Sequence, residues 1–386
     1  MVKGREKIRV GIISYDLSEP RGGTKLALSL GNQLKAAGCE VAISCVKENI
    51  KDFEDFFGEK YDFKIYRAKR TFLSNRLVHY TALWNHREPT LGLIEEFKPH
   101  IVIEIGGIIT SLMPAVQKGI PTIYYCTMPV SRYADVNIYK VNLPSKLQLK
   151  FFSLFENYLI NRIDRVIAMC QFTERLIKQM WDKKIIIINP PTKISTFKQR
   201  GKKGRVILSV CRYDAAYQLD KLIETFRRIS KENKLYELHL TAELSEKDKE
   251  YYEKLKASIN PKERIYLHKN LSFDELLRLY NKAEIFWYTS FTHFGYIFVE
   301  AQASGIPVVA FKRMGGAEEI VVNGKSGFLV DDFDELYEKT KILINNRSLW
   351  QKMSKAAREN SERFSMEVFR ERFVDVIEEV LKRHAS

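Results

Sequence analysis

Short runs of β-branched residues alternate with longer amphipathic segments along most of this chain, beginning at Ile8. This alternation is typical of βαβ units, in which helices join parallel strands and cover both faces of the sheet. The first half contains six predicted strands: Ile8–Ser14, Glu40–Cys45, Ile101–Ile105, Thr122–Cys126, Arg165–Ala168 and Ile185–Ile188. Helical patterns such as Thr24–Ala37 and Gln171–Met180 lie between them. We therefore expect the first half to be one doubly wound α/β domain.

A second alternating series begins at Arg205. Its predicted strands are Val206–Val210, Glu237–Leu240, Ile265–His268, Ile285–Tyr288, Pro307–Phe311 and Gly327–Val330. The chain has 386 residues, a length that suits two such domains. Residues 192–204 are rich in Lys, Thr and Gly without apolar periodicity, which is typical of a linker. The predicted organisation is a first domain at 1–191, the linker, a second domain at 205–365 and a C-terminal helix at 366–386 that packs back on the first domain.

The composition narrows the classes of partner. A formal net charge of +15 favours phosphate-bearing ligands, an acidic membrane surface or nucleic acid. The chain lacks the aromatic RNP patterns, zinc-finger spacings and basic heptad regions of nucleic-acid-binding proteins, so we predict no nucleic-acid partner. Its five cysteines show no CxxC spacing, which argues against a zinc site and against a disulfide framework.

Two features of the sequence, the N-terminal residues and the most apolar window, indicate where in the cell the protein is expected. The chain begins with charged residues and moves directly into a strand pattern, without the apolar stretch of a signal peptide. The window Ile101–Val116 is shorter than the roughly 20 residues that a membrane-spanning helix requires. We therefore expect a cytoplasmic protein that does not cross a membrane.

The loop after the predicted strand Ile285–Tyr288 carries the strongest chemical signal. Ligands of open parallel sheets bind beyond the carboxyl ends of the strands, where helix N-termini converge. Here Gly295 lets backbone N–H groups approach an anion at the start of a helix that we expect near Phe298. Glu300, one turn into that helix, can face the hydroxyl groups of a ribose; the alternative is an ordinary surface acid in a first helical turn.

The segments that follow this loop carry a family resemblance. They are Ala301–Ala310, Gly315–Val321 and Asn323–Val330. Their order and spacing resemble the retaining glycosyltransferases of family 4, whose GT-B fold has two Rossmann-like domains facing a cleft. Weaker similarity covers Gly22–Gly23, Val166–Thr173, Asn189–Pro191 and Arg212. The amino-acid sequences of His293–Gly295 and Tyr124–Pro129 are most similar to those of the family branch that adds mannose to lipid-linked oligosaccharides.

The resemblance implies roles for the matching positions. Arg212 would bind the donor diphosphate together with backbone amides of Phe294–Tyr296, and Glu300 would hold the ribose as the second acid of an E-x7-E motif. The implied catalytic positions are Arg212, Glu300 and Thr292. The implied donor-binding set is Gly22, Gly23, His293, Phe294, Gly295, Tyr296, Lys312, Arg313, Gly315, Gly316 and Glu319. Thr127 and Arg132 would lie on the acceptor side, and an ordinary tight turn is the alternative for Gly22 and Gly23.

Four positions depart from the family pattern. Thr292 stands where the first acid is expected, Cys211 replaces the glycine before Arg212, and Tyr217 or Gln218 replaces the phosphate-binding lysine. Thr127 or Cys126 stands at the position of a histidine in the first domain. Lys221, Lys312 or Arg313 could restore the lost positive charge. In retaining transfer the leaving diphosphate can accept the acceptor's proton, so a missing side-chain base is tolerable.

Two functions therefore stay open. In the first, the chain transfers a hexose of the mannose or glucose type, with retention, from a GDP- or UDP-sugar to a hydroxyl acceptor such as a glycan or lipid-linked glycan. In the second, it is a non-catalytic relative that binds nucleotide or glycan as a partner of another protein. We expect no obligatory cofactor or metal in either case. Asp332–Asp334 has the spacing of a metal-binding DxD motif, but it follows a predicted strand and begins a helix, which is typical of a helix cap.

Two stretches interleave basic and aromatic residues, Arg67–Trp84 and Lys146–Ile163. Such stretches can lie on the acidic inner face of a membrane, with cations at the head groups and rings at the interface. Amphipathic helices that pack on their own sheet are the alternative.

Overall fold

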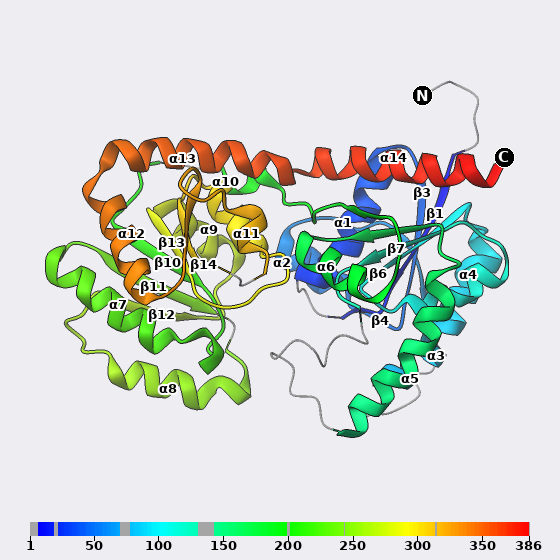
Figure 1. Ribbon diagram of the computed structural model, residues 1–386, viewed down its shortest axis with the longest axis horizontal. Coiled ribbons are helices and arrows are strands. Elements are labelled where there is room, and N and C mark those ends of the chain that lie inside the picture. Colours follow the sequence, from blue (N-terminus) through cyan, green and yellow to red (C-terminus); the bar gives the residue numbers. More distant parts are fainter. Residues whose placement is uncertain are drawn as a thin grey trace. The chain divides into compact units, whose positions relative to one another are not determined.

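The computed structural model describes residues 7–18, 22–69, 78–129, 143–198, 201–242, 244–312 and 315–385. They form two compact units: Met1–Pro191 with Met366–Ser386, and Thr192–Ser365. Each unit contains a parallel sheet with helices packed against it (Figure 1). The predicted α/β class, with one doubly wound sheet in each half of the chain, is confirmed.

The sheet of the first unit has seven parallel strands in the order β5-β3-β1-β6-β7-β8-β9. The strands are β1 (Arg9–Ser14), β3 (Glu40–Cys45), β5 (Lys64–Arg67), β6 (Ile101–Ile105), β7 (Thr122–Cys126), β8 (Arg165–Ala168) and β9 (Ile185–Ile187). All six predicted strands are present, whereas β5 was not expected. Its four residues form an edge of the sheet, and both ends of the run are charged, so it lacks the apolar character of the inner strands.

Helices and one short ribbon complete the first unit. The helices are α1 (Gly22–Ala36), α2 (Ile50–Phe57), α3 (Val78–Gly92), α4 (Met113–Gln117), α5 (Leu143–Ile160) and α6 (Gln171–Met180). Strands β2 (Asp16–Leu17) and β4 (Lys47–Glu48) pair in parallel as the ribbon.

The second unit has six parallel strands in the order β12-β11-β10-β13-β14-β15. These are β10 (Val206–Val210), β11 (Glu237–Ala242), β12 (Ile265–Lys269), β13 (Ile285–Tyr288), β14 (Val308–Phe311) and β15 (Gly327–Val330). Its helices are α7 (Leu219–Glu232), α8 (Lys249–Ser258), α9 (Phe273–Lys282), α10 (Tyr296–Ala303), α11 (Ala317–Ile320), α12 (Phe333–Asn345) and α13 (Arg347–Ser361). All six strands predicted for this half are present.

The strand order fixes where each unit can bind a ligand. From β10 the chain builds outward to β12 and then returns to place β13 on the other side of β10. The loops after β10 and β13 therefore run in opposite directions, which opens a crevice at the carboxyl ends of these two strands. In the first unit the same reversal lies between β1 and β6.

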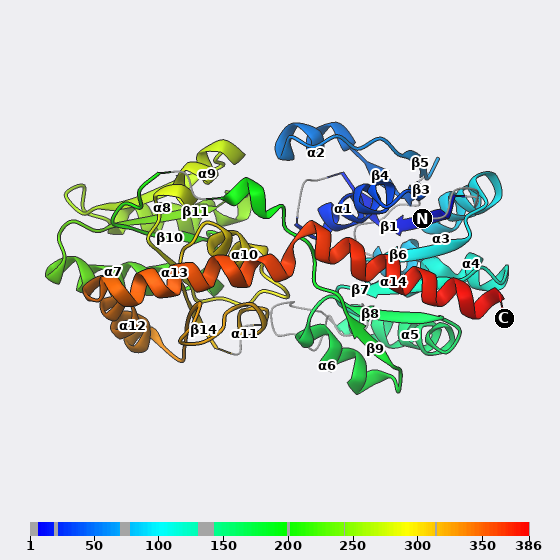
Figure 2. The ribbon, with the colours of Figure 1, turned by 90° about the horizontal axis from the view of Figure 1, so that it is seen from above.

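The last helix, α14 (Met366–Ala385), belongs to the first unit, where it packs on α1 and lies along the unit in both views (Figures 1 and 2). The fully buried ring of Phe373 meets that of Tyr125 edge to face, with the centroids 5.4 Å apart. Arg165 on β8, only 4 % exposed, forms an ion pair with Glu379. A tertiary core, and not only helix propensity, therefore holds this segment in place.

The segment 192–204, expected to be a linker, lies within the second unit. Thr192 donates its backbone N–H to Phe364 O at 2.8 Å. Phe197 is 5 % exposed, and its ring contacts those of Phe273 and Tyr280 edge to face. One aromatic side chain therefore anchors a stretch that shows no apolar periodicity in sequence.

None of the described helices combines the length and the apolar character that crossing a bilayer requires.

Candidate functional site

The loop after β10 and the loop after β13 form the crevice at the carboxyl ends of these two strands, and a hydrogen bond joins the two loops. Tyr213, in the loop after β10, is fully buried, and its hydroxyl donates to His268 O at 2.6 Å and to Leu240 O at 3.2 Å. Thr289, in the loop after β13, donates its hydroxyl to Tyr217 O at 3.1 Å. These hydrogen bonds fix the backbone of the loop that follows Arg212.

Arg212 is exposed at this edge and lies near two phenols. The rings of Tyr217 and Tyr288 meet edge to face, with centroids 6.0 Å apart. Burial raises the pKa of each phenol, and the Arg212 guanidinium acts in the opposite direction on both. Tyr217 stands where the resemblance leads one to expect a lysine, so a partly buried phenol replaces an ammonium group beside Arg212. The neighbouring residue, Gln218, adopts a positive φ of 50° at the N-cap of α7.

The glycines of the Gly315–Gly316 loop are required by a close approach of two backbones. Gly316 donates its N–H to Thr292 O at 2.9 Å. A Cβ at Gly315 would lie 2.0 Å from Thr292 O, and one at Gly316 would lie 1.7 Å from Phe294 O. Since real Cβ atoms do not approach oxygens this closely, only glycine lets the two loops pack together.

Gly295 ends the loop after β13 with a left-handed φ of 85° and is the N-cap of α10. The helix begins at Tyr296, so the predicted start near Phe298 was wrong by two residues. A Cβ at Gly295 would lie 2.7 Å from the Phe298 ring. The N-terminus of α10 therefore follows the loop at the carboxyl end of β13, which is the position where helix N-termini bind anions in open α/β sheets. Burial lowers the pKa of His293 in this loop, which favours the neutral imidazole.

Glu300 lies one turn into α10, where Tyr280 fixes one of its carboxylate oxygens. The buried Tyr280 hydroxyl on α9 donates to Glu300 Oε2 at 2.8 Å. Burial together with Glu300 raises the pKa of Tyr280 far above its usual range, so the phenol stays a proton donor. The hydrogen bond from Tyr280 thus fixes the orientation of the Glu300 carboxylate.

The cations named as substitutes for the missing lysine have other neighbours. Lys312 Nζ pairs with Asp331 Oδ2 at 2.7 Å. Lys221 Nζ lies 5.6 Å from the centroid of the Phe333 ring. Arg313 falls outside the described residues. Glu319 lies on the short helix α11 and donates its N–H to Gly316 O at 3.2 Å.

In the first unit, Gly22 and Gly23 form the first turn of α1. The Thr127 hydroxyl donates to Gly106 O, and Thr127 O accepts from the Thr173 hydroxyl at 2.9 Å, so this residue braces the loop after β7. Arg132 lies outside the described residues.

Sequence reasoning missed Glu104, at the switch point of the first unit. This residue of β6 is 2 % exposed and accepts the N–H groups of Gly107 and Ile108. Burial raises its pKa to about 8, although the two amides act in the other direction. An acid inside the apolar window Ile101–Val116, followed by two glycines, was the signal that could have revealed it.

Asp332 accepts the N–H of Glu335 at 2.8 Å and caps α12, as its position after a strand predicts. Among the described residues, no three His, Cys, Asp or Glu side chains gather as a metal site would require.

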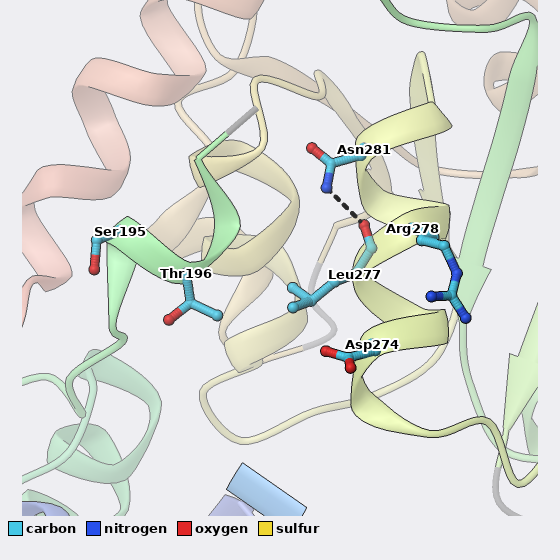
Figure 3. Close-up of a pocket in the computed structure, with 6 residues that line it drawn as sticks. All are labelled: Ser195, Thr196, Asp274, Leu277, Arg278 and Asn281. Atoms are coloured by element: carbon cyan, nitrogen blue, oxygen red, sulfur yellow. Dashed lines mark hydrogen bonds between the residues drawn. The ribbon is translucent and has the colours of Figure 1, made fainter. Parts of the chain in front are cut away.

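A cavity of about 550 Å³ lies in the second unit between α9 and the 3-10 helix Ile194–Phe197. Figure 3 shows Thr196 and Leu277 directed toward each other across it. Its described lining residues are Ser195, Thr196, Asp274, Leu277, Arg278 and Asn281. None of these belongs to the expected donor site.

Two family models match the chain over most of its length. The model for glycosyl transferases group 1 matches residues 192–360, and the model for glycosyltransferase family 4 matches residues 20–195. A GDP-Man:Man(3)GlcNAc(2)-PP-Dol alpha-1,2-mannosyltransferase from Dictyostelium discoideum is 23 % identical over 274 residues. That match covers 64 % of this chain but only 54 % of the mannosyltransferase. An uncharacterized glycosyltransferase from Haemophilus influenzae is 20 % identical, covering 93 % of this chain and 97 % of the relative.

Solved structures share the fold at low identity. Sucrose-phosphate synthase from Thermosynechococcus elongatus superposes with a TM-score of 0.77 at 17 % identity, covering 98 % of this chain and all of that one. HepE from Anabaena, solved in complex with UDP and glucose, superposes with a TM-score of 0.71 at 14 % identity, covering 96 % of this chain and 99 % of that one.

Proposed function

The chain belongs to the group 1, family 4 glycosyltransferases of the GT-B fold, and from this premise we propose that its second unit binds a nucleotide-diphosphate sugar. The observation that carries the proposal is the arrangement at the β10–β13 switch point. Arg212 and the N-terminus of α10 lie on the two loops that flank the crevice, and Glu300 follows one turn later with its carboxylate held by Tyr280. A diphosphate suits the first two groups, and ribose hydroxyls suit the third.

The proposed reaction transfers a hexose with retention of configuration. The bond between the anomeric carbon and the diphosphate oxygen breaks, and an acceptor hydroxyl forms the new bond on the same face. The leaving diphosphate takes the acceptor's proton, and Arg212 with the α10 amides stabilises the charge that develops on it. This chemistry needs no side-chain base from the protein, which suits a chain with Thr127 at the expected position of a histidine.

We propose a GDP- or UDP-linked hexose of the mannose or glucose type as the donor, and a glycan or lipid-linked glycan as the acceptor. The Dictyostelium relative is named for GDP-mannose and a PP-Dol oligosaccharide, and structures of HepE contain UDP and UDP-glucose. The neutral Thr292 in place of the first motif acid removes a charge near the sugar. We therefore expect the pocket to discriminate among hexoses less sharply than a carboxylate would.

Contact with the inner face of an anionic membrane is part of the same proposal. Helix α5 exposes Leu154 and Tyr158, which are 62 % and 53 % exposed and share one helix face. The Arg162 guanidinium lies 3.8 Å from the centroid of the Tyr158 ring. An exposed leucine and tyrosine on one helix face, with a cation against the tyrosine ring, suit a head-group interface. Retention of the protein in solution when mixed with anionic liposomes would remove this part of the proposal.

The donor site is tested with a panel of GDP- and UDP-sugars. A bound donor raises the melting temperature by mass action, by an amount that grows with its concentration above the dissociation constant. We expect a rise with at least one nucleotide sugar, followed by transfer or slow hydrolysis, and loss of both effects in Arg212→Ala and Glu300→Ala. Arg264→Ala is the matched control, because this exposed arginine directly precedes β12, at the opposite end of the sheet from the donor site, and pairs with Glu237. No shift with any nucleotide sugar at millimolar concentration would overturn the proposal.

The non-catalytic alternative rests on the pairing of Lys312 with Asp331 and on Tyr217 at the lysine position, which together lower the positive charge around the diphosphate. In that case a nucleotide sugar would raise the melting temperature, yet neither transfer nor hydrolysis would occur with any acceptor.

A further inference from the structure

A second pocket in the second unit is strongly cationic. It measures about 460 Å³ and lies between the start of the segment that leads into β10 and one face of α13. Its described lining residues are Gly201, Lys202, Lys203, Arg347, Trp350, Gln351, Ser354 and Arg358. Four of them are basic residues and none is acidic. None of them belongs to the proposed donor site, so this pocket is a separate feature of the chain.

The position of Arg358 in this pocket depends on Gly305. A Cβ at Gly305 would lie 2.0 Å from Arg358 Nη1, so the missing side chain leaves the space that the guanidinium occupies. Arg358 Nη1 donates to the Ser354 hydroxyl at 3.2 Å, and that hydroxyl donates to Gly305 O at 2.7 Å. The hydrogen bond and the space above Gly305 therefore fix the position of the Arg358 guanidinium.

Lys203 faces the same pocket from the other side. Its Nζ donates to Tyr280 O at 2.8 Å, which leaves the ammonium group two further donors. Burial, and then repulsion from Arg358, lowers the pKa of Lys203 to about 7, while Glu284 acts in the opposite direction. Two basic groups therefore lie close together in a partly desolvated place, and a bound anion would stabilise the protonated form of Lys203.

Glu284, the acid that acts on Lys203, does not fill this role, because Arg347 and Tyr236 already bind its carboxylate. Arg347 pairs with one oxygen of the buried Glu284 carboxylate, and Tyr236 donates its hydroxyl to the other at 2.6 Å. Arg347 also stacks over the Trp350 ring, 4.0 Å from its centroid. The ion pair with Glu284 thus holds Arg347 in place, and the described lining of the pocket itself contains no acid.

We propose that this pocket binds the phosphate group of an anionic ligand, with Lys203 and Arg358 as the central donors and Lys202 and Arg347 at the rim. A guanidinium and an ammonium group together match the oxygens of a phosphate monoester or diphosphate. The volume falls within the range of small-molecule sites. A free phosphorylated metabolite and a phospholipid head group present the same chemistry, and experiment separates these two sources.

Binding is measured by calorimetry with inorganic pyrophosphate in an Arg212→Ala background, so that the proposed donor site does not contribute. We expect Lys203→Met with Arg358→Met to weaken binding at least tenfold, and Arg358→Lys to restore part of the affinity. Lys352→Gln with Lys355→Gln removes the same charge from exposed positions of the same helix outside the pocket, and should leave the affinity within about twofold. Equal losses in both double variants would mean diffuse charge attraction and would overturn the proposal.

Lysine labelling gives a readout that does not depend on the donor site or on the stability of variants. The unmodified full chain is treated with a limiting acylating reagent, and each lysine is quantified by peptide mass spectrometry. Pyrophosphate should slow labelling of Lys203 at least fivefold relative to sodium chloride of equal ionic strength, with Lys352 unchanged. An unchanged rate at Lys203 would contradict the proposal even if every variant failed to fold.

The source of the phosphate is resolved with vesicles. Flotation with phosphatidic acid vesicles, but not with phosphatidylcholine vesicles, that is lost in the Lys203 and Arg358 double variant would identify a lipid head group. Pyrophosphate binding without such flotation would identify a soluble phosphorylated ligand. Either result supports the phosphate site, and absence of both contradicts it.

Discussion

The phenolic hydroxyl of Tyr280 lies 2.8 Å from a carboxylate oxygen of Glu300 and donates a hydrogen bond to it across the α9–α10 contact. The ring of Tyr280 is fully buried and packs edge to face on Phe197, with the centroids 5.5 Å apart. A carboxylate with one oxygen held this way presents the other in a fixed direction. This pair links the core of the second unit to the group that we propose binds the ribose.

Removing the Tyr280 hydroxyl should weaken donor binding while leaving the fold intact. Tyr280→Phe keeps the ring and deletes one hydrogen bond to a charged group, a change of about 1.5 kcal/mol, or roughly tenfold. We expect KM for the donor to rise by about this factor with kcat less affected, because the ribose contact is the same in ground and transition states. Steady-state kinetics check this, and a fall in kcat alone would show that Glu300 acts otherwise than in binding.

Arg212 is expected to carry most of the diphosphate interaction, since Tyr217 replaces the second cation. Arg212→Ala should lower donor affinity by about 2 to 3 kcal/mol, which is roughly 30- to 150-fold. Arg212→Lys should recover only part of this loss, because an ammonium group lacks the two-pronged geometry of a guanidinium. Isothermal titration with the donor and with its nucleoside diphosphate measures both effects. Full recovery in the lysine variant would mean that charge alone matters.

A comparison of Gly315 with Gly324 separates the steric cost of adding a side chain from the cost of a left-handed backbone conformation. Both have positive φ, 82° and 76°, yet a Cβ at Gly315 would strike Thr292 O whereas one at Gly324 would meet nothing within 4 Å. Gly324→Ala should cost about 1 to 2 kcal/mol from backbone strain. Gly315→Ala should cost more, about 3 kcal/mol or above, and should also weaken donor binding. Urea unfolding compares the two, and equal costs would show that the loops separate without penalty.

Glu104 should make stability depend on pH. Burial raises the pKa of its carboxyl from 4.5 to about 8, so between these values the folded protein holds a proton that the unfolded chain has released. Its contribution is therefore complete below about pH 4.5 and is lost as the pH rises toward 8. Burial also raises the pKa of Tyr124 and Cys126 nearby, which keeps both neutral in this window.

The comparison variant is Glu104→Gln, which is neutral at every pH. Relative to it, the unfolding free energy of the wild type should fall by at most about 1.4 kcal/mol per pH unit between pH 5 and 8. Hydrogen exchange of peptides from β6 across a urea series reports this unit selectively. A difference between the two proteins that does not change with pH would rule the effect out.

Phe373 should contribute strongly to the stability of the first unit. Phe373→Ala removes a fully buried ring that packs on Tyr125 and should cost about 3 to 5 kcal/mol. Lys382→Ala, on the same helix with an exposed side chain, should change stability by less than about 0.5 kcal/mol. Hydrogen exchange of β7 and α14 peptides provides the measurement, and a small effect at Phe373 would mean that α14 docks only loosely.

Local patterns in the sequence predicted most of the strands and their order, but not β2, β4 or β5. Alternation of β-branched and amphipathic runs located all twelve predicted strands, and the position of Asp332 after a strand identified it as a helix cap. Such features depend on periods of two or 3.6 residues and on capping within one turn, so neighbouring residues are enough to reveal them. The motif order that carries the family resemblance is local in the same sense.

Contacts between distant segments were decided only by the tertiary structure. Lys312 was a candidate for the donor phosphates, yet it pairs with Asp331; Phe197 anchors a stretch that resembles a linker; and Glu104 becomes a buried, protonated acid. Each outcome depends on groups brought together by folding, and on the burial that follows. The sequence thus specified a two-unit glycosyltransferase scaffold. Tertiary packing in each unit determined which charged side chains form ion pairs, which are buried and which are accessible to a ligand.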